Sequence, residues 1–284
     1  PPMWPFLFIT IACGAISGFH SLVASGTSAK QVRSENDSLF VGYGSMVTEG
    51  FLATLVTIAV AAGIGLGYEH QGEMLFGTEA WTNHYASWAA AQGLNDKVGS
   101  FVIGAANMIQ TMGIPFSLAI AIMGVFVASF AATTMDSATR VQRYVVTELF
   151  DFLGVKAFKN IYFTTFVVVA TAALLAFVSG ADGKGALTLW PIFGAINQTL
   201  AGLALIVITL YLKNRSNTHW LIAGIPAAFM VVMTLWASLL NEINFIENQN
   251  WLLTGVNGII ILLVVLIVIE GTRTLLTTQP KHPL

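Results

Sequence analysis

Residues 252–270, LLTGVNGIIILLVVLIVIE, decide the fold class of this protein. The stretch contains one charged residue, Glu270, which stands at its end. A helix needs about 20 mostly apolar residues to cross the hydrocarbon core of a bilayer, and this stretch has that length. Other stretches along the chain have the same character. The predicted spans are residues 5–24, 44–67, 114–134, 161–179, 189–212, 219–240 and 252–270.

The overall composition leads to the same conclusion. The 284 residues are 56% hydrophobic and 9% charged, whereas soluble domains carry about 25% charged residues. Because backbone polar groups in hydrocarbon must be satisfied internally, the spans should be helices. We therefore predict an all-α, polytopic transmembrane helix bundle with seven spans, forming a single transmembrane domain over residues 1–284. The net charge of −2 argues against nucleic acid as a partner, since no basic surface is available for phosphates.

Lysine and arginine are distributed unequally between the predicted loops. One side of the membrane receives Lys30, Arg33, Arg140, Arg143, Lys156, Lys159, Lys213, Arg215, Arg273 and Lys281. The other side receives Lys97 and Lys184. Since basic loops favour the cytoplasm, we predict that the N-terminus lies outside and the C-terminus inside. Residues 70–99, which mix acidic and aromatic side chains, then form an extracellular amphipathic segment, and residues 100–113 should lead into the third span as an extended helix.

The start of the chain suggests a longer protein. It begins at Pro1 rather than at Met, and an odd number of spans places this start outside. We therefore expect the chain to be a fragment, whose partner would include the missing N-terminal part of the same protein.

The first predicted span carries a small and polar cluster. It reads Cys13-Gly-Ala-Ile-Ser17-Gly-Phe-His20-Ser, with glycines at 14 and 18. One interpretation is a discontinuous helix whose freed backbone groups line a binding cavity. The other is a packing face of small residues four apart, which is the commoner outcome of such spacing. A single histidine such as His20 is more often a hydrogen-bonded packing residue than a ligand.

Other spans also carry polar side chains that the bilayer disfavours. Glu49 lies two turns inside the second span, where it is a proton carrier or a structural glutamate. Thr133, Asp136, Ser137 and Arg140 share one face of the third span, which suits a small cation or a proton relay. The alternative is an Asp136–Arg140 pair beside hydroxyls that bond their own helix. In the fifth span, Asn197 and Gln198 follow a predicted kink at Pro191 and Gly194, and they either join helices or contact a solute.

The sequence contains no cluster of histidines or cysteines at metal-ligand spacing, no phosphate-binding loop and no serine–histidine constellation. We therefore expect no enzyme, no metal and no cofactor.

Several motifs together resemble the carbon starvation protein A (CstA) family. They are FLFITIACGAISGFHSLVASGTSAK at 6–30, GYG at 42–44 with Glu49, TTMDSATRVQR at 133–143 and LWPIFGAINQ at 189–198. The resemblance implies a multi-pass transporter of the bacterial inner membrane, which imports peptides or small carboxylates such as pyruvate during carbon starvation. Coupling to H⁺ or Na⁺ is also implied, with H⁺ favoured. The alternative is a channel or a structural membrane subunit without ion coupling.

The resemblance also implies a fold and a set of site residues. The fold would be the second inverted repeat of the amino acid–polyamine–cation transporters plus two accessory helices, with the N-terminal repeat missing and residues 70–99 acting as an extracellular lid. The substrate-binding candidates are Gly14, Ser17, Gly18, Phe19, His20, Trp190, Asn197 and Gln198. The coupling-ion candidates are Glu49, Thr133, Thr134, Asp136 and Ser137.

Overall fold

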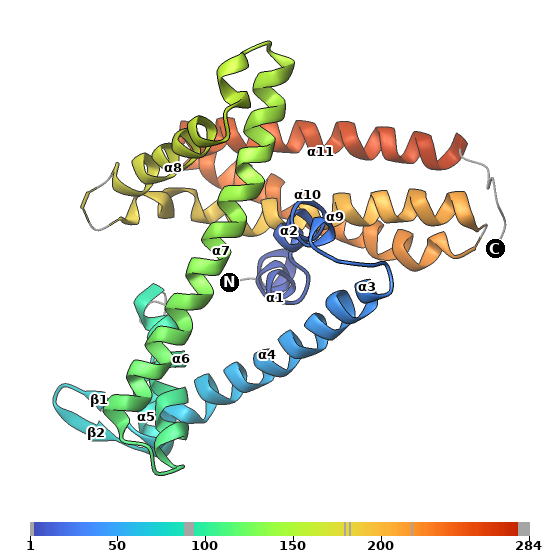
Figure 1. Cartoon of the computed structure of the whole chain (residues 1–284). Helices are drawn as coiled ribbons and strands as arrows, with labels where there is room; N and C mark the ends of the chain where they lie inside the picture. The colour runs from blue at the N-terminus through green and yellow to red at the C-terminus, as the bar shows by residue number, and fades with distance from the viewer. Residues whose placement is uncertain (1–2, 88–93, 179, 182, 217, 278–284) are drawn as a thin grey trace. The chain divides into compact units, whose positions relative to one another are not determined.

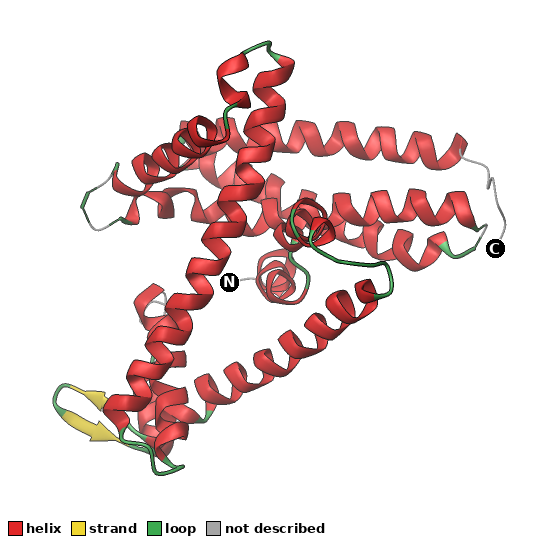
Figure 2. Cartoon of the chain, in the orientation of Figure 1, coloured by secondary structure: helices red, strands yellow, loops and turns green. Residues whose placement is uncertain are grey.

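The computed structural model describes residues 3–87, 94–178, 180–181, 183–216 and 218–277, and nearly all of them are helical (Figures 1 and 2). The α-helices are α1 Phe8–Ala15, α2 Gly18–Gly26, α3 Asp37–Leu39, α4 Ser45–Ala61, α5 Gly77–His84, α6 Leu94–Gln110, α7 Phe116–Phe152, α8 Ile161–Phe177, α9 Trp190–Arg215, α10 Trp220–Glu247 and α11 Trp251–Thr277. Short helical turns are η1 Met3–Leu7, η2 Ser28–Lys30, η3 Phe40–Gly44, η4 Gly63–Leu66, η5 Lys156–Lys159 and η6 Lys184–Leu189. Strands β1 Tyr68–His70 and β2 Glu73–Leu75 form an antiparallel hairpin.

Six helical segments within the described residues are long and apolar enough to cross a membrane. They are Met3–Lys30, Asp37–Ala61, Phe116–Phe152, Gly185–Arg215, Trp220–Glu247 and Trp251–Thr277. This content agrees with the predicted membrane helix bundle. Helix α8 is apolar but has 17 residues, so the span predicted at 161–179 remains a prediction, and so does the inverted-repeat fold.

The chain divides into two compact units, of which the first combines Pro1–Lys30 with Thr139–Leu284. Its central helix is α9, because α1, α2, α10 and α11 all pack on it (Figure 1). Small side chains on α9 are buried at these contacts: Ala195 packs with Ile9 and Ala237, and Gly202 lies against Met230. Such small residues let helix backbones approach closely where lipid supplies little driving force for association.

In the second unit, Gln31–Ala138, two glycines allow α6 to pack closely against η4 and the end of α4. A Cβ atom added at Gly63 would lie 2.4 Å from the Gly104 carbonyl oxygen, and one added at Gly104 would lie 2.1 Å from the Ala59 carbonyl oxygen. The end of α4 and η4 therefore contact α6 backbone to backbone. Asn107 Nδ2 donates to the carbonyl oxygens of Gly63 at 2.9 Å and Gly67 at 2.7 Å, which satisfies acceptors that the ending helix leaves free.

The hairpin occupies the start of the predicted amphipathic segment 70–99. Its turn is Gln71-Gly72, with φ of 52° and 87°, which is the positive-φ pair that a two-residue hairpin requires. Helix α5 follows, and the Tyr85 hydroxyl donates to the Val60 carbonyl oxygen at 3.0 Å, tying the segment to α4. Residues 88–93 of the segment lie outside the described residues, and its role as an extracellular lid stays a prediction.

The prediction that residues 100–113 lead into the third span as an extended helix is wrong. Helix α6 ends at Gln110, and α7 begins at Phe116. Gly113 adopts φ +92° in the connection, and Pro115 follows it, lacking the N–H that a continuing helix needs. Helix α7 in turn extends to Phe152, well beyond the predicted end of the third span at 134, because neither glycine nor proline occurs between Gly124 and Gly154.

We expect Gly104→Ala to destabilise the protein by about 1–3 kcal/mol, the usual cost of overpacking, because its Cβ would meet the Ala59 carbonyl oxygen. Gly99→Ala on the same helix is the matched control, since nothing lies within 4 Å of a Cβ atom there. Thermal unfolding of the two detergent-solubilised variants measures the difference. Equal melting temperatures would contradict the close contact of α6 with α4.

Candidate solute and ion sites

The first membrane segment is interrupted, as the discontinuous-helix interpretation predicts. Helix α1 ends at Ala15 and α2 begins at Gly18. The two residues between them are extended, with φ/ψ of −136°/97° at Ile16 and −96°/125° at Ser17. Since no proline stands at the break, contacts from elsewhere in the chain must hold the backbone open and satisfy its freed groups.

Asn197 of α9 supplies most of these contacts. Its Oδ1 accepts hydrogen bonds from the Phe19 backbone N–H at 2.8 Å and from the Ser17 hydroxyl at 3.2 Å. Its Nδ2 donates to Cys13 Sγ at 2.9 Å. One amide side chain therefore bonds to the last turn of α1, to the extended link and to the first turn of α2.

Gln198 completes the connection from the next position on α9. Its Nε2 donates to the Ile16 carbonyl oxygen at 2.8 Å, so an acceptor freed by the break is satisfied. The side chain is fully buried, with 0% exposure. Its Oε1 is buried and has no hydrogen-bond partner among the residues that the structure describes. A buried acceptor without a donor is costly, which makes this atom the most conspicuous unsatisfied group at the break.

The two glycines of the break have different roles. A Cβ atom added at Gly18 would lie 2.0 Å from the Asn197 carbonyl oxygen and 2.6 Å from the Ala201 backbone nitrogen. Gly18 is therefore a close-packing residue, as the second interpretation of the cluster predicts. A Cβ atom added at the exposed Gly14 would have no described residue outside its own helix segment within 4 Å. The break thus has a packed side against α9 and an open side at Gly14.

The remaining solute candidates are less closely grouped. His20 is exposed beside the half-buried Phe19, their ring centroids 6.4 Å apart. Trp190 is 58% exposed and stacks on Phe193. It precedes Asn197 by seven residues, which is about 10 Å along the helix. The structure therefore groups Gly14, Ser17, Gly18, Phe19, Asn197 and Gln198 at the break, with His20 at its edge, and leaves Trp190 at the end of α9.

The hydroxyls of the ion candidates bond to their own helix. Thr133 Oγ1 donates to the Ser129 carbonyl oxygen at 2.9 Å, and Thr134 Oγ1 donates to the Phe130 carbonyl oxygen at 3.0 Å. This is the self-bonded arrangement that the alternative interpretation predicts. Each hydroxyl keeps acceptor capacity for a cation, because its lone pairs are not used in these bonds.

The two candidate carboxyl groups lie on different helices. Asp136 is close to the hydroxyls in the sequence of α7, and Glu49 is on α4. Asp136 is exposed and Ser137 is half-buried, both on α7. Thr134 lines an apolar cavity of about 480 Å³ together with Leu52 and Val56 of α4. Glu49, which is exposed, precedes Leu52 by three residues and shares its helix face. Among the residues that the structure describes, no group of three His, Cys, Asp or Glu side chains could hold a metal ion.

We expect Asn197→Ala to lower the free energy of unfolding by about 1–3 kcal/mol, because it removes a buried amide and leaves the Phe19 N–H without its acceptor. Asn214→Ala, at an exposed position on the same helix, should have little effect. Denaturant titration of the detergent-solubilised protein compares them. The bonding described for Asn197 would be refuted by two variants of equal stability.

Known proteins related to this chain are transporters. The family model described as "Carbon starvation protein CstA" matches residues 1–237. The "Peptide transporter CstA" of Helicobacter pylori is 32% identical over 283 residues, covering 87% of this chain and 41% of the relative. That of Mycobacterium tuberculosis is 33% identical over 277 residues, covering 83% and 36%. The "Pyruvate/proton symporter BtsT" of Escherichia coli is 29% identical over 305 residues, covering 83% and 41%.

These matches leave much of each relative uncovered, since the chain spans about two fifths of the length of the curated relatives it matches. No solved structure matches the chain. The family match nevertheless includes the broken helix, α7 and the amide pair of α9. With most of its length matched by the family model and by named members, the chain belongs to the carbon starvation protein CstA family.

Proposed function

We propose that the chain is part of a secondary active transporter that imports peptides or small carboxylates such as pyruvate, coupled to protons, during carbon starvation. The observation that carries the proposal is the interrupted helix α1–α2, held open by Asn197 and Gln198. Discontinuous membrane helices are the usual binding elements of secondary transporters, because their free ends and unwound backbone contact solutes and ions. The names of the relatives supply the two solute classes.

Peptides and pyruvate share a carboxylate, and the break suits an anion of this kind. Helix α2 begins at Gly18, so the positive end of its dipole points to the break. Gly14, Ala15 and Ile16 are exposed beside it. A carboxylate on this open side would approach the first turn of α2.

For coupling, we propose that Thr133, Thr134, Asp136 and Ser137 form the polar end of a cation or proton site and that Glu49 carries the proton. Glu49 lies in a candidate membrane span, and carboxyl groups inside membrane spans often belong to ion pathways and proton relays. Thr134 lines an apolar cavity with Leu52 and Val56, which share a face of α4 with Glu49. This supports the assignment of the hydroxyls of α7 and of Glu49 to one coupling site. Asp136, one turn from Arg140, orients the site instead.

The location follows from the same considerations. We propose a multi-pass protein of the bacterial inner membrane, with the N-terminus of this chain outside, its C-terminus in the cytoplasm and residues 70–99 as an extracellular lid. The uneven distribution of basic residues between the loops supports this orientation.

Gly14→Leu should reduce uptake of labelled pyruvate or of a labelled dipeptide by about tenfold or more, since loss of one good polar contact costs about that factor. Its side chain would fill the open side of the break without disturbing packing. Ala24→Leu, at an exposed position on α2, is the control. Membrane vesicles with equal protein levels give the comparison, and the solute that is lost identifies the class carried. Normal uptake of both solutes by Gly14→Leu would leave the break as a packing feature, as in a channel or structural subunit.

Asp136→Asn should weaken gradient-driven uptake, and Glu49→Gln should remove its pH dependence, while counterflow exchange continues in both. Exchange requires solute binding but no net ion movement, so it separates coupling from binding. Loss of exchange as complete as the loss of driven uptake would assign both residues to folding or solute binding.

A further inference from the structure

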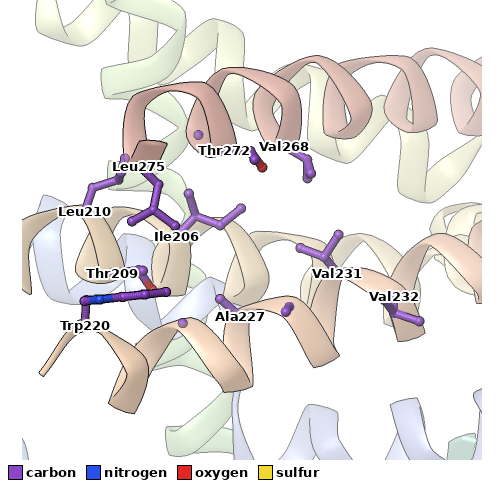
Figure 3. Close-up of a pocket in the computed structure, with 13 residues that line it drawn as sticks. Ile206, Thr209, Leu210, Trp220, Ala227, Val231, Val232, Val268, Thr272 and Leu275 are labelled. Carbon is purple, nitrogen blue, oxygen red and sulfur yellow. The ribbon is translucent and has the colours of Figure 1, made fainter. Parts of the chain in front are cut away.

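A second feature of the first unit lies away from the broken helix, between α9, α10 and α11 (Figure 3). It is a groove of about 350 Å³. Its walls are almost entirely apolar, with Ile206 and Leu210 from α9, Val231 from α10, and Val268 and Leu275 from α11. On α9 it begins eight residues after Gln198, about 12 Å along the axis, so it is separate from the proposed solute site.

Small residues make the groove concave. Gly224 and Ala228 stand on its α10 wall, and Gly271 stands on its α11 wall. A Cβ atom at Gly271 would lie 2.8 Å from Ile206 Cγ2, and one at Gly224 would lie 3.0 Å from the Trp220 ring. Larger side chains at these positions would close the space between the helices.

The longest wall of the groove is about as long as one leaflet of a bilayer is thick. Its lining on α10 runs from Trp220 to Val232, a rise of about 18 Å over twelve residues. Half of the hydrocarbon core is about 15 Å thick. Trp220 stands at the N-terminus of α10, the place where a tryptophan marks the lipid–water interface. The groove therefore extends from one interface to about the middle of the membrane.

The mouth of the groove is positively charged. Lys213 Nζ lies over the ring of Trp220, 5.3 Å from its centroid. It follows the lining residue Leu210 by three positions and so shares its helix face. Arg215 and Arg273 lie at the same ends of α9 and α11. Glu270, which precedes the lining residue Gly271, is exposed and lies about 200° around α11 from Val268.

We propose that this groove binds an anionic phospholipid, with one acyl chain between α9, α10 and α11 and the phosphate at Lys213. An apolar trough one leaflet deep fits an acyl chain, and a lysine at its interfacial end fits a phosphate. A zwitterionic lipid such as phosphatidylcholine also fits the trough, but its quaternary ammonium offsets the charge of its phosphate, so it gains less from Lys213. All of α11 lies beyond residues 1–237 of the family match, so the third wall of the site is formed outside the matched region.

The probe is phosphatidylglycerol with a photoactivatable acyl chain, reconstituted with the full chain in phosphatidylcholine vesicles. Mass spectrometry of the adducts should place them on the lining stretches of α10 and α11, and unlabelled phosphatidylglycerol should compete better than phosphatidylcholine. Ala228→Phe, which fills the groove, should lower the adduct yield there by about fivefold or more. Ile225→Phe, outside the lining and 66% exposed, should not.

A second pair of variants tests the headgroup. Lys213→Gln should reduce the preference for phosphatidylglycerol over phosphatidylcholine by about fivefold, the contribution of one lysine near an anionic surface. Arg215→Gln, whose guanidinium lies against Tyr211 instead, should change it by less than about twofold. Equal competition by both lipids in the wild-type protein would overturn the proposal, and so would adducts that Ala228→Phe leaves in place. Loss of solute uptake in Ala228→Phe with unchanged adducts would assign the groove to the solute instead.

Discussion

The interaction on which the first unit depends is the bonding of Asn197 and Gln198 to the break between α1 and α2. A helix interrupted inside a membrane leaves carbonyl and N–H groups without intrahelical partners, and hydrocarbon offers none. The two adjacent amides provide both kinds of partner from one helix, since Asn197 Oδ1 accepts from Phe19 and Gln198 Nε2 donates to Ile16. The central position of α9 follows from this requirement, because the helix that satisfies the break must also be fixed by its own neighbours, α10 and α11.

This arrangement reconciles two interpretations that exclude each other when only the sequence is considered. Gly18 serves packing, because the backbone of α9 occupies the space where its side chain would be. Gly14 stands on the open side, because a Cβ atom added there meets no other described part of the chain within 4 Å. The amides join helices, yet they do so by holding the break in place rather than by closing it. The link is thus packed against α9 on one side and exposed at Gly14 on the other.

Much of the fold could be predicted from hydropathy, because a lipid-embedded helix must be apolar over most of its length. The break was one of two interpretations that the sequence left open, and the spacing of the glycines alone favoured the packing face. The residues that hold the break open could not be predicted: Cys13 and Asn197 are 184 positions apart in the chain, and helical periodicity gives no information about contacts at such separation.

The end of α7 was missed because hydropathy falls after residue 134, whereas a helix continues through polar residues as long as neither glycine nor proline stops it. The stop between α6 and α7 could have been found from Gly113 and Pro115.

The unbroken length of α7 has a consequence for hydration. Its 37 residues extend about 55 Å, nearly twice the roughly 30 Å of a hydrocarbon core. Counted from Phe116 along an untilted helix, the core is crossed after about 20 residues, which is the point where Asp136 and Ser137 stand. On that placement, the hydroxyls of Thr133 and Thr134 would lie just within the lipid and Arg140 would lie in water. A cation that reached this boundary would exchange part of its water shell for protein oxygens while keeping the rest, so its entry would not require complete dehydration.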